Sequence, residues 1–330
     1  MVKNFPRYLA LTVTGLILLA RVVHAYNPLS EPPSFKPLIL DLSLHDTARN
    51  RDIPLRFYLP DSHLPAPVVL FSPGLGGNRA GSAYLGKHWS ARGYVALYVQ
   101  HPGSDDAVWK GIPTAKQAGS FRKAASVKNF YLRVQDIHTV LKQLSFFNRN
   151  PNTPLHGRLN LSKIGMSGHS FGAITTEAVS GENFPIIGQK LTDEHIKAAI
   201  AFSPSLPGVS SATNAMQKVA IPWMLMTGTK DISLVGHTDA ADRLLLYPAL
   251  HHAPKYEVIL NNAEHSAFID RSLHGDREPR NPNHHRVILA LSTAFWDSYL
   301  MNHHSALQWL NGSGPQSVFE KKDRWHCSSH

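Results

Sequence analysis

The segment 163–173 holds the residues with the clearest chemical potential, because Gly168, Ser170 and Gly172 form a Gly-x-Ser-x-Gly pattern there. An apolar run typical of a strand precedes the pattern, and a helix-compatible run follows it. A serine on such a tight strand-to-helix turn is a nucleophile elbow. The turn strains the serine backbone, and side chains two positions before or after it would collide, so glycine is needed at both. The pattern predicts that Ser170 is a nucleophile.

A serine nucleophile needs a base, and the base needs a carboxylate that orients it. The apolar run 223–226 is followed by Asp231, and the next run, 256–260, is followed by His265. Both residues would lie at the edge of the sheet where the serine lies, in the order Ser, Asp, His. We therefore assign Asp231 as the acid and His265 as the general base. Two nearby carboxyls remain alternative acids, Glu264 and Asp270.

The oxyanion formed by attack on a carbonyl needs two backbone donors. One is normally the amide of the residue after the nucleophile, here Phe171, and the other comes from a loop after an early strand. The glycine-rich segment 71–77 fits that loop, and we favour the Leu75 amide over that of Gly76.

The same glycine-rich loop has to be compared with a dinucleotide-binding fingerprint. Gly74-x-Gly76 would need a third glycine where the chain has Arg79, and the next strand ends in residues 99–101 without an acid for a ribose. We expect no cofactor.

Short apolar runs that alternate with helical patterns surround these residues. An antiparallel hairpin is expected first, at 37–44 and 54–60, and buried parallel strands are expected after it. Helical spacing is clearest over 125–146 and 285–300. The alternation predicts an α/β class with a mostly parallel sheet and helices on both faces. The expected parallel strands are 68–71, 95–99, 163–166, 198–202, 223–226 and 256–260.

Two irregular stretches, 103–123 and 204–220, follow expected strands, and loops at the carboxyl ends of strands bind ligands in such folds. The first stretch offers only a few large apolar groups, with Trp109 the largest. An acyl pocket of acetyl to butyryl size is therefore expected. We assign Trp109 and His169 to substrate binding.

The N-terminal residues differ from the rest of the chain. Lys3 and Arg7 precede a short apolar run that Arg21 ends, and small residues lead to Ala25. This is typical of a secretory signal peptide over 1–25 rather than of a membrane anchor, since a span needs about 20 apolar residues. We expect cleavage after Ala25, a secreted or periplasmic protein without an integral membrane segment, and one domain over 26–330. Its core would cover about 36–310, with a C-terminal tail at 312–330.

Composition limits the other function classes. Hydrophobic residues make up 43% and charged residues 17% of the 330 positions, which excludes disordered and fibrous classes. The net charge of +10 is scattered, without basic runs and interleaved aromatics, so no nucleic-acid partner is expected. Cys327 is the only cysteine and permits no internal disulfide. The 20 histidines show no HExxH motif, so no metal site is expected; a histidine-rich metal binder and a catalytically silent binding protein remain alternatives.

Five motifs together resemble one family. They are FSPGLGGNR (71–79), VQHPGSDD (99–106), GHSFGA (168–173), MTGTKD (226–231) and NNAEH (261–265). The chain from about 36 to 310 is similar to α/β-hydrolases of the platelet-activating factor acetylhydrolase and predicted dienelactone hydrolase group.

The resemblance implies the α/β-hydrolase fold, a triad of Ser170, Asp231 and His265, and an oxyanion hole from Leu75 and Phe171. It also implies hydrolysis of carboxylic esters without a cofactor. True dienelactone hydrolases have a cysteine where this chain has Ser170. We therefore expect a serine carboxylic ester hydrolase acting on a small-molecule or lipid ester.

Overall fold

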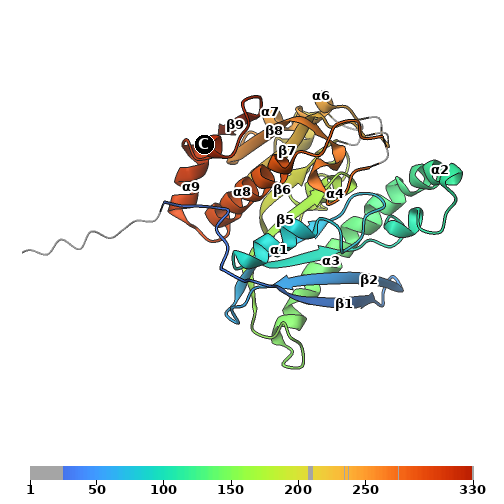
Figure 1. Ribbon diagram of the computed structural model, residues 1–330. Coiled ribbons are helices and arrows are strands. Elements are labelled where there is room, and N and C mark those ends of the chain that lie inside the picture. The colour runs from blue at the N-terminus through green and yellow to red at the C-terminus, as the bar shows by residue number, and fades with distance from the viewer. Residues whose placement is uncertain (1–24, 207–210, 234, 237, 274, 329–330) are drawn as a thin grey trace, which may run out of the picture.

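The computed structural model describes residues 25–206, 211–233, 235–236, 238–273 and 275–328 (Figure 1). The expected signal peptide lies outside the described residues, apart from Ala25, so it stays a prediction. Among the helices of the described residues, none combines the length and the apolar character that a bilayer crossing needs.

A nine-stranded sheet carries the fold, in the order β1-β2-β4-β3-β5-β6-β7-β8-β9. The six strands from β4 to β8 in this order run parallel, and the pairs β1-β2, β2-β4 and β8-β9 are antiparallel. The mixed α/β class, the mostly parallel sheet and the N-terminal hairpin are thus confirmed. The strands are β1 (Leu38–Asp46), β2 (Arg51–Leu59), β3 (Ala66–Ser72), β4 (Val95–Val99), β5 (Leu159–His169), β6 (Ile196–Phe202), β7 (Trp223–Lys230), β8 (Lys255–Glu264) and β9 (Arg324–Ser328).

Helices cover both faces of the sheet, because side chains that alternate along each central strand enter different cores. In β3, Val69 and Phe71 pack with α1 and α8, whereas Val68 and Leu70 pack with α3 on the other face. Continuous apolar strands of this kind are typical of parallel sheets. The helices are α1 (Ala83–Ala91), α2 (Thr114–Ala124), α3 (Val127–Arg149), α4 (Phe171–Val179), α5 (Ala212–Met216), α6 (Ala240–Arg243), α7 (Leu246–Ala249), α8 (Pro282–Tyr299) and α9 (His304–Asn311), with short 3₁₀ turns η1 (Asp106–Val108), η2 (His265–Phe268) and η3 (Pro315–Ser317).

The strand order reverses beside β3. The chain passes from β3 to β4 on one side and then crosses to β5 on the other side of β3. The helices that follow β3 and β5, α1 and α4, therefore pack into different cores on opposite faces of the sheet. Ser72 ends β3 and Ser170 directly follows β5, so the elbow lies at the strand ends beside this reversal, where open α/β sheets bind ligands.

Both stretches that we expected to be irregular contain helices: 103–123 contains η1 and α2, and 204–220 contains α5. The segment expected to be a C-terminal tail, 312–330, contains η3 and β9. β9 forms the edge of the sheet and pairs with β8, where Cys327 lies opposite Tyr256 and the His326 ring contacts the Glu257 carboxylate at 2.7 Å. The residues that pair with this short polar strand lie more than sixty positions away in the sequence, so the strand cannot be predicted from its own residues.

Candidate active site

Ser170 occupies a strained turn between β5 and α4. Its φ of 56° and ψ of −116° lie in a region that side chains other than glycine rarely adopt. The turn is fixed because the Ser170 amide donates to the Phe202 carbonyl at 2.9 Å, while the Ser170 carbonyl accepts from the first turn of α4. The hydroxyl is thereby presented at the carboxyl edge of the sheet, as the sequence pattern predicts.

The two glycines of the elbow are required by close backbone contacts. A Cβ on Gly168 would lie 2.2 Å from the Gly172 carbonyl oxygen, and a Cβ on Gly172 would lie 1.8 Å from the Ser72 carbonyl oxygen. These neighbours are backbone atoms and cannot rotate away. The predicted steric reason for both glycines is confirmed.

Ser170, His265 and Asp231 form one hydrogen-bonded chain. His265 follows β8 and places Nε2 2.9 Å from the Ser170 Oγ and Nδ1 2.7 Å from the Asp231 Oδ1. The Asp231 side chain is fully buried, whereas that of His265 is 12% exposed. A neutral imidazole that donates from Nδ1 to the carboxylate leaves Nε2 free to accept the serine proton.

Asp231 is held as a carboxylate by its surroundings. Its Oδ2 accepts from the Thr227 hydroxyl at 2.9 Å, and the Arg243 Nε lies 3.1 Å from its Oδ1. Burial alone would raise the pKa of Asp231, but the charge and hydrogen bond of His265 and the charge of Arg243 outweigh it and lower the pKa to about 2. Arg243 itself is buried in α6 and also donates to the carbonyls of Ser203 and Pro204.

The alternative acids face other partners. Both Glu264 oxygens accept backbone amides from Arg277 and Glu278, and Asp270 accepts the amide of Ala83 at 2.8 Å. Neither is hydrogen-bonded to His265, so the geometry favours Asp231.

The oxyanion candidates differ in how their amides are used. The Gly76 amide already donates to the Ser104 carbonyl at 2.9 Å. In the described part of the chain, the amides of Leu75 and Phe171 donate no hydrogen bond. Two unengaged amides on neighbouring segments could receive an oxyanion, which favours Leu75 over Gly76.

His169 packs against the catalytic candidate His265 and is itself buried. Its Nε2 lies 3.0 Å from the His265 carbonyl oxygen, and the two ring centroids are 4.7 Å apart. Burial, together with repulsion from His265, lowers the pKa of His169 to about 3, so it stays neutral and donates from Nε2. These contacts orient the His265 loop, and a substrate-binding role for His169 stays a prediction.

Trp109 lies beside the glycine-rich segment 71–77, which we call the oxyanion loop because it carries the candidate donor Leu75. Its indole Nε1 donates to the Gly76 carbonyl at 2.8 Å, and the exposed Arg271 guanidinium lies 5.1 Å above its ring. A Cβ on Gly76 would meet both Phe121 and Trp109. The 103–123 segment therefore covers the loop that carries the oxyanion candidates, and a substrate contact by Trp109 stays a prediction.

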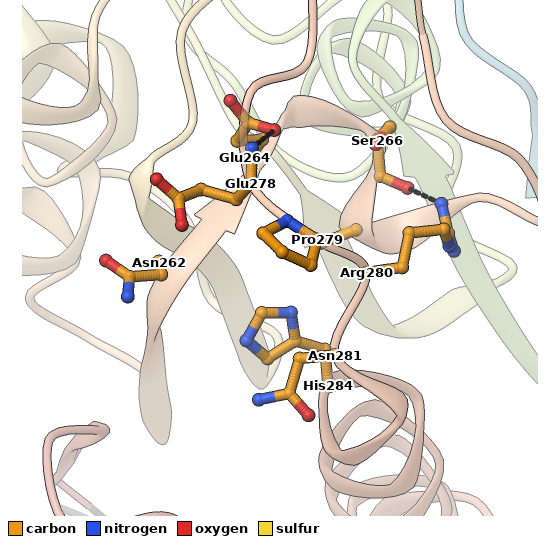
Figure 2. A pocket seen from close by; sticks show the side chains of 9 residues that line it. Asn262, Glu264, Ser266, Glu278, Pro279, Arg280, Asn281 and His284 are labelled. Carbon is orange, nitrogen blue, oxygen red and sulfur yellow. Dashed lines mark hydrogen bonds between the residues drawn. The ribbon is translucent and has the colours of Figure 1, made fainter.

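A small cavity lies next to the His265 loop (Figure 2). Residues of the end of β8, of η2 and of the 278–284 segment line it, and neither Ser170 nor His265 is among them. Its hydrogen bonds tie the loop down, since Glu264 accepts the Glu278 amide and the Arg280 guanidinium donates to the Ser266 carbonyl. The residues that line the cavity therefore hold the His265 loop in place.

Several charged residues near the site were not predicted. Arg243 and the buried residues behind the oxyanion loop, Arg133 and Asp136, carry no sequence motif. A signal was present for the last two, because both lie on the apolar stripe of α3 with Val134 and Ile137. Among the described residues, no group of three or more histidine, cysteine, aspartate or glutamate side chains could hold a metal ion.

No protein-family model matches the chain, and no curated protein matches it.

Proposed function

We propose that this chain is a serine carboxylic ester hydrolase that acts through an acyl-enzyme. One observation carries the proposal: the hydrogen-bonded chain from Ser170 through His265 to the buried Asp231, with the serine on a strained strand-to-helix turn. Such a chain is the arrangement that activates a serine hydroxyl.

In the proposed mechanism, His265 Nε2 takes the hydroxyl proton as the Ser170 Oγ attacks the ester carbonyl. The amides of Leu75 and Phe171 donate to the oxyanion that forms. His265 then gives its proton to the leaving alcohol, and the acyl group remains on Ser170. In the second step His265 takes a proton from water as the water attacks this acyl-enzyme, and it then gives that proton to the Ser170 Oγ as the acid leaves, which restores the hydroxyl. Asp231 stabilises the imidazolium in both steps.

The proposed fold family is the α/β-hydrolase, in the group that includes platelet-activating factor acetylhydrolases. The strand order supports it, because the elbow follows β5 beside the point where the order reverses, and Asp231 and His265 follow β7 and β8. We further propose a secreted or periplasmic location, on the N-terminal sequence alone.

Loss of the nucleophile tests the proposed function. A fluorophosphonate probe should label the wild-type protein, and p-nitrophenyl acetate should be hydrolysed. Ser170→Ala should abolish labelling and lower kcat by about 10⁴-fold or more. Ser298→Ala is a matched control, since it removes another buried hydroxyl, in α8. A folded wild-type protein without labelling would indicate the silent binding protein instead.

We also propose that the substrate has a short acyl chain and that Trp109 forms part of its pocket. The indole is held beside the oxyanion loop, where an acyl or alcohol group would lie. Trp109→Ala should change KM and the preference along a series from acetate to hexadecanoate esters more than it changes kcat on the acetate. Faster hydrolysis of the C16 than of the C4 ester, or an unchanged profile in the variant, would contradict this assignment.

A further inference from the structure

A second group of polar side chains lies behind the oxyanion loop, and none of its members is in the proposed mechanism. We call it the Arg133 cluster; it consists of Arg133 and Asp136 from α3, Ser72 from the end of β3 and His101 after β4. Each side chain is at most 1% exposed. Burying an arginine costs several kcal/mol unless other contacts offset it, so its position calls for a reason.

Three of these residues repeat the residue types of a catalytic triad. The Ser72 Oγ lies 3.0 Å from the His101 Nε2, and the His101 Nδ1 lies 3.0 Å from the Asp136 Oδ2. The Ser72 Oγ also accepts from the Arg133 guanidinium at 3.0 Å. No substrate can reach a hydroxyl that is fully buried, so this chain of hydrogen bonds holds structure rather than performing chemistry.

The guanidinium of Arg133 contacts the loop that carries Leu75. One nitrogen donates to the Pro73 carbonyl, and another donates to the Ser104 hydroxyl at 2.9 Å. The carbonyl of Ser104 in turn accepts the Gly76 amide. Arg133 therefore holds the loop on both sides of Leu75.

The same guanidinium contacts the segment that carries Phe171. Its Nε donates to the Thr175 hydroxyl at 3.0 Å, and that hydroxyl donates to the Phe171 carbonyl at 2.9 Å. The guanidinium carbon also lies 4.7 Å from the centre of the Phe171 ring. A planar group with a fixed fork of donors thus spans the two segments whose amides would bind the oxyanion.

The charge of Arg133 is not cancelled by a direct ion pair. Its hydrogen bonds go to carbonyl and hydroxyl oxygens, and within the described residues no carboxylate lies within 4 Å of it. Asp136 instead accepts from Arg49 and Arg51. A buried positive charge beside both donor segments favours negative charge that develops between them.

We propose that Arg133 is a positioning residue that sets the spacing of the Leu75 and Phe171 amides and adds a favourable field at the oxyanion. The proposal rests on the proposed esterase function. Because the oxyanion forms only as the carbonyl is attacked, Arg133 should act on kcat and leave ground-state binding of a small ester nearly unchanged.

Two buried arginines provide a matched test. Arg158 is also buried and donates to the backbone carbonyls of Pro60 and Ser62, but it precedes β5 and so lies at the opposite end of the strand from Ser170. Arg133→Gln should lower kcat on p-nitrophenyl acetate by about 10²-fold with KM changed less than about threefold, the size of losing one oxyanion donor. Arg133→Lys keeps the charge and should recover about tenfold of that loss. Arg158→Gln should lower the melting temperature and leave kcat unchanged.

A gentler pair of variants covers the case in which Arg133→Gln does not fold. Thr175→Val keeps the side-chain volume but removes the hydroxyl between Arg133 and Phe171, and Thr175→Ser keeps the hydroxyl. We expect kcat to fall about tenfold in the valine variant only, with fluorophosphonate labelling slowed in parallel.

The outcomes separate the two proposals. An active wild-type enzyme whose kcat is equally insensitive to Arg133→Gln and Arg158→Gln, or to Thr175→Val and Thr175→Ser, overturns the role of Arg133 alone. A folded wild-type protein that neither hydrolyses esters nor reacts with the probe overturns the proposed function, and the role of Arg133 with it.

Discussion

His101 should make the stability of the protein depend on pH over a defined range. Burial, reinforced by repulsion from Arg133, outweighs the hydrogen bond to Asp136 and lowers the pKa of His101 from 6.5 to about 4. The unfolded chain therefore binds a proton at His101 below pH 6.5, whereas the folded chain does so only near pH 4. Between these values the unfolded state holds more protons, so the free energy of unfolding rises with pH.

The size of this effect follows from the shift. At 1.36 kcal/mol for each pKa unit, the whole window from 4 to 6.5 corresponds to about 3 kcal/mol, of which about 2 kcal/mol falls between pH 5 and pH 7. His101→Gln removes the titrating group but keeps a side chain that can form hydrogen bonds. The difference in unfolding free energy between the wild type and this variant should therefore be about 2 kcal/mol larger at pH 7 than at pH 5.

Urea unfolding followed by tryptophan fluorescence at several pH values measures this difference. His63→Gln is the control, because His63 is an exposed histidine outside the Arg133 cluster. A difference in unfolding free energy between wild type and His101→Gln that stays constant from pH 5 to pH 7 would refute the reasoning, because protonation of His101 would then not be what destabilises the folded protein in acid.

Three further predictions concern the elbow, the acid and a buried carboxyl. Asp231→Asn should lower kcat by about 10⁴-fold in steady-state assays with little change in KM, while Glu264→Gln stays far closer to wild type. Gly172→Ala should lose both activity and thermal stability, because its Cβ would meet the Ser72 carbonyl at 1.8 Å; Gly119→Ala, with open space, should lose neither by the same assays. Burial raises the pKa of Glu182 above its ordinary value, so stability is lost as pH rises above that value, and Glu182→Gln should gain in urea unfolding relative to wild type as pH is raised from 5 to 9.

The positions of Ser170, Asp231 and His265 could be predicted because the signals for them are local. Each follows a short apolar run, and parallel strands bring their carboxyl ends to one edge whatever their order in the sheet. The elbow glycines add a steric requirement that is visible in the sequence itself. Strand order and the pairing of β9 with β8 depend on contacts between distant residues, so no local pattern predicts them.

The charged residues that support the site could not be assigned for a different reason. Arginine and aspartate lie mostly on protein surfaces, so Arg243 in a short helix is expected to face water rather than Asp231. The sequence pattern of α3 did contain a signal, but an ambiguous one. Arg133 and Asp136 interrupt an apolar stripe, which indicates buried charge, but the partners that satisfy such charge come from β3 and β4.

The two chains of serine, histidine and aspartate in this fold share residue types but differ in their environment. Ser170 lies on a strained turn, and the side chain of its histidine is 12% exposed. Ser72 accepts a hydrogen bond from Arg133 of α3 and is fully buried at the end of β3. Its hydroxyl has the same kind of base within reach but no space in which a tetrahedral intermediate could form. The buried chain instead fixes the end of β3, from which the Leu75 loop departs.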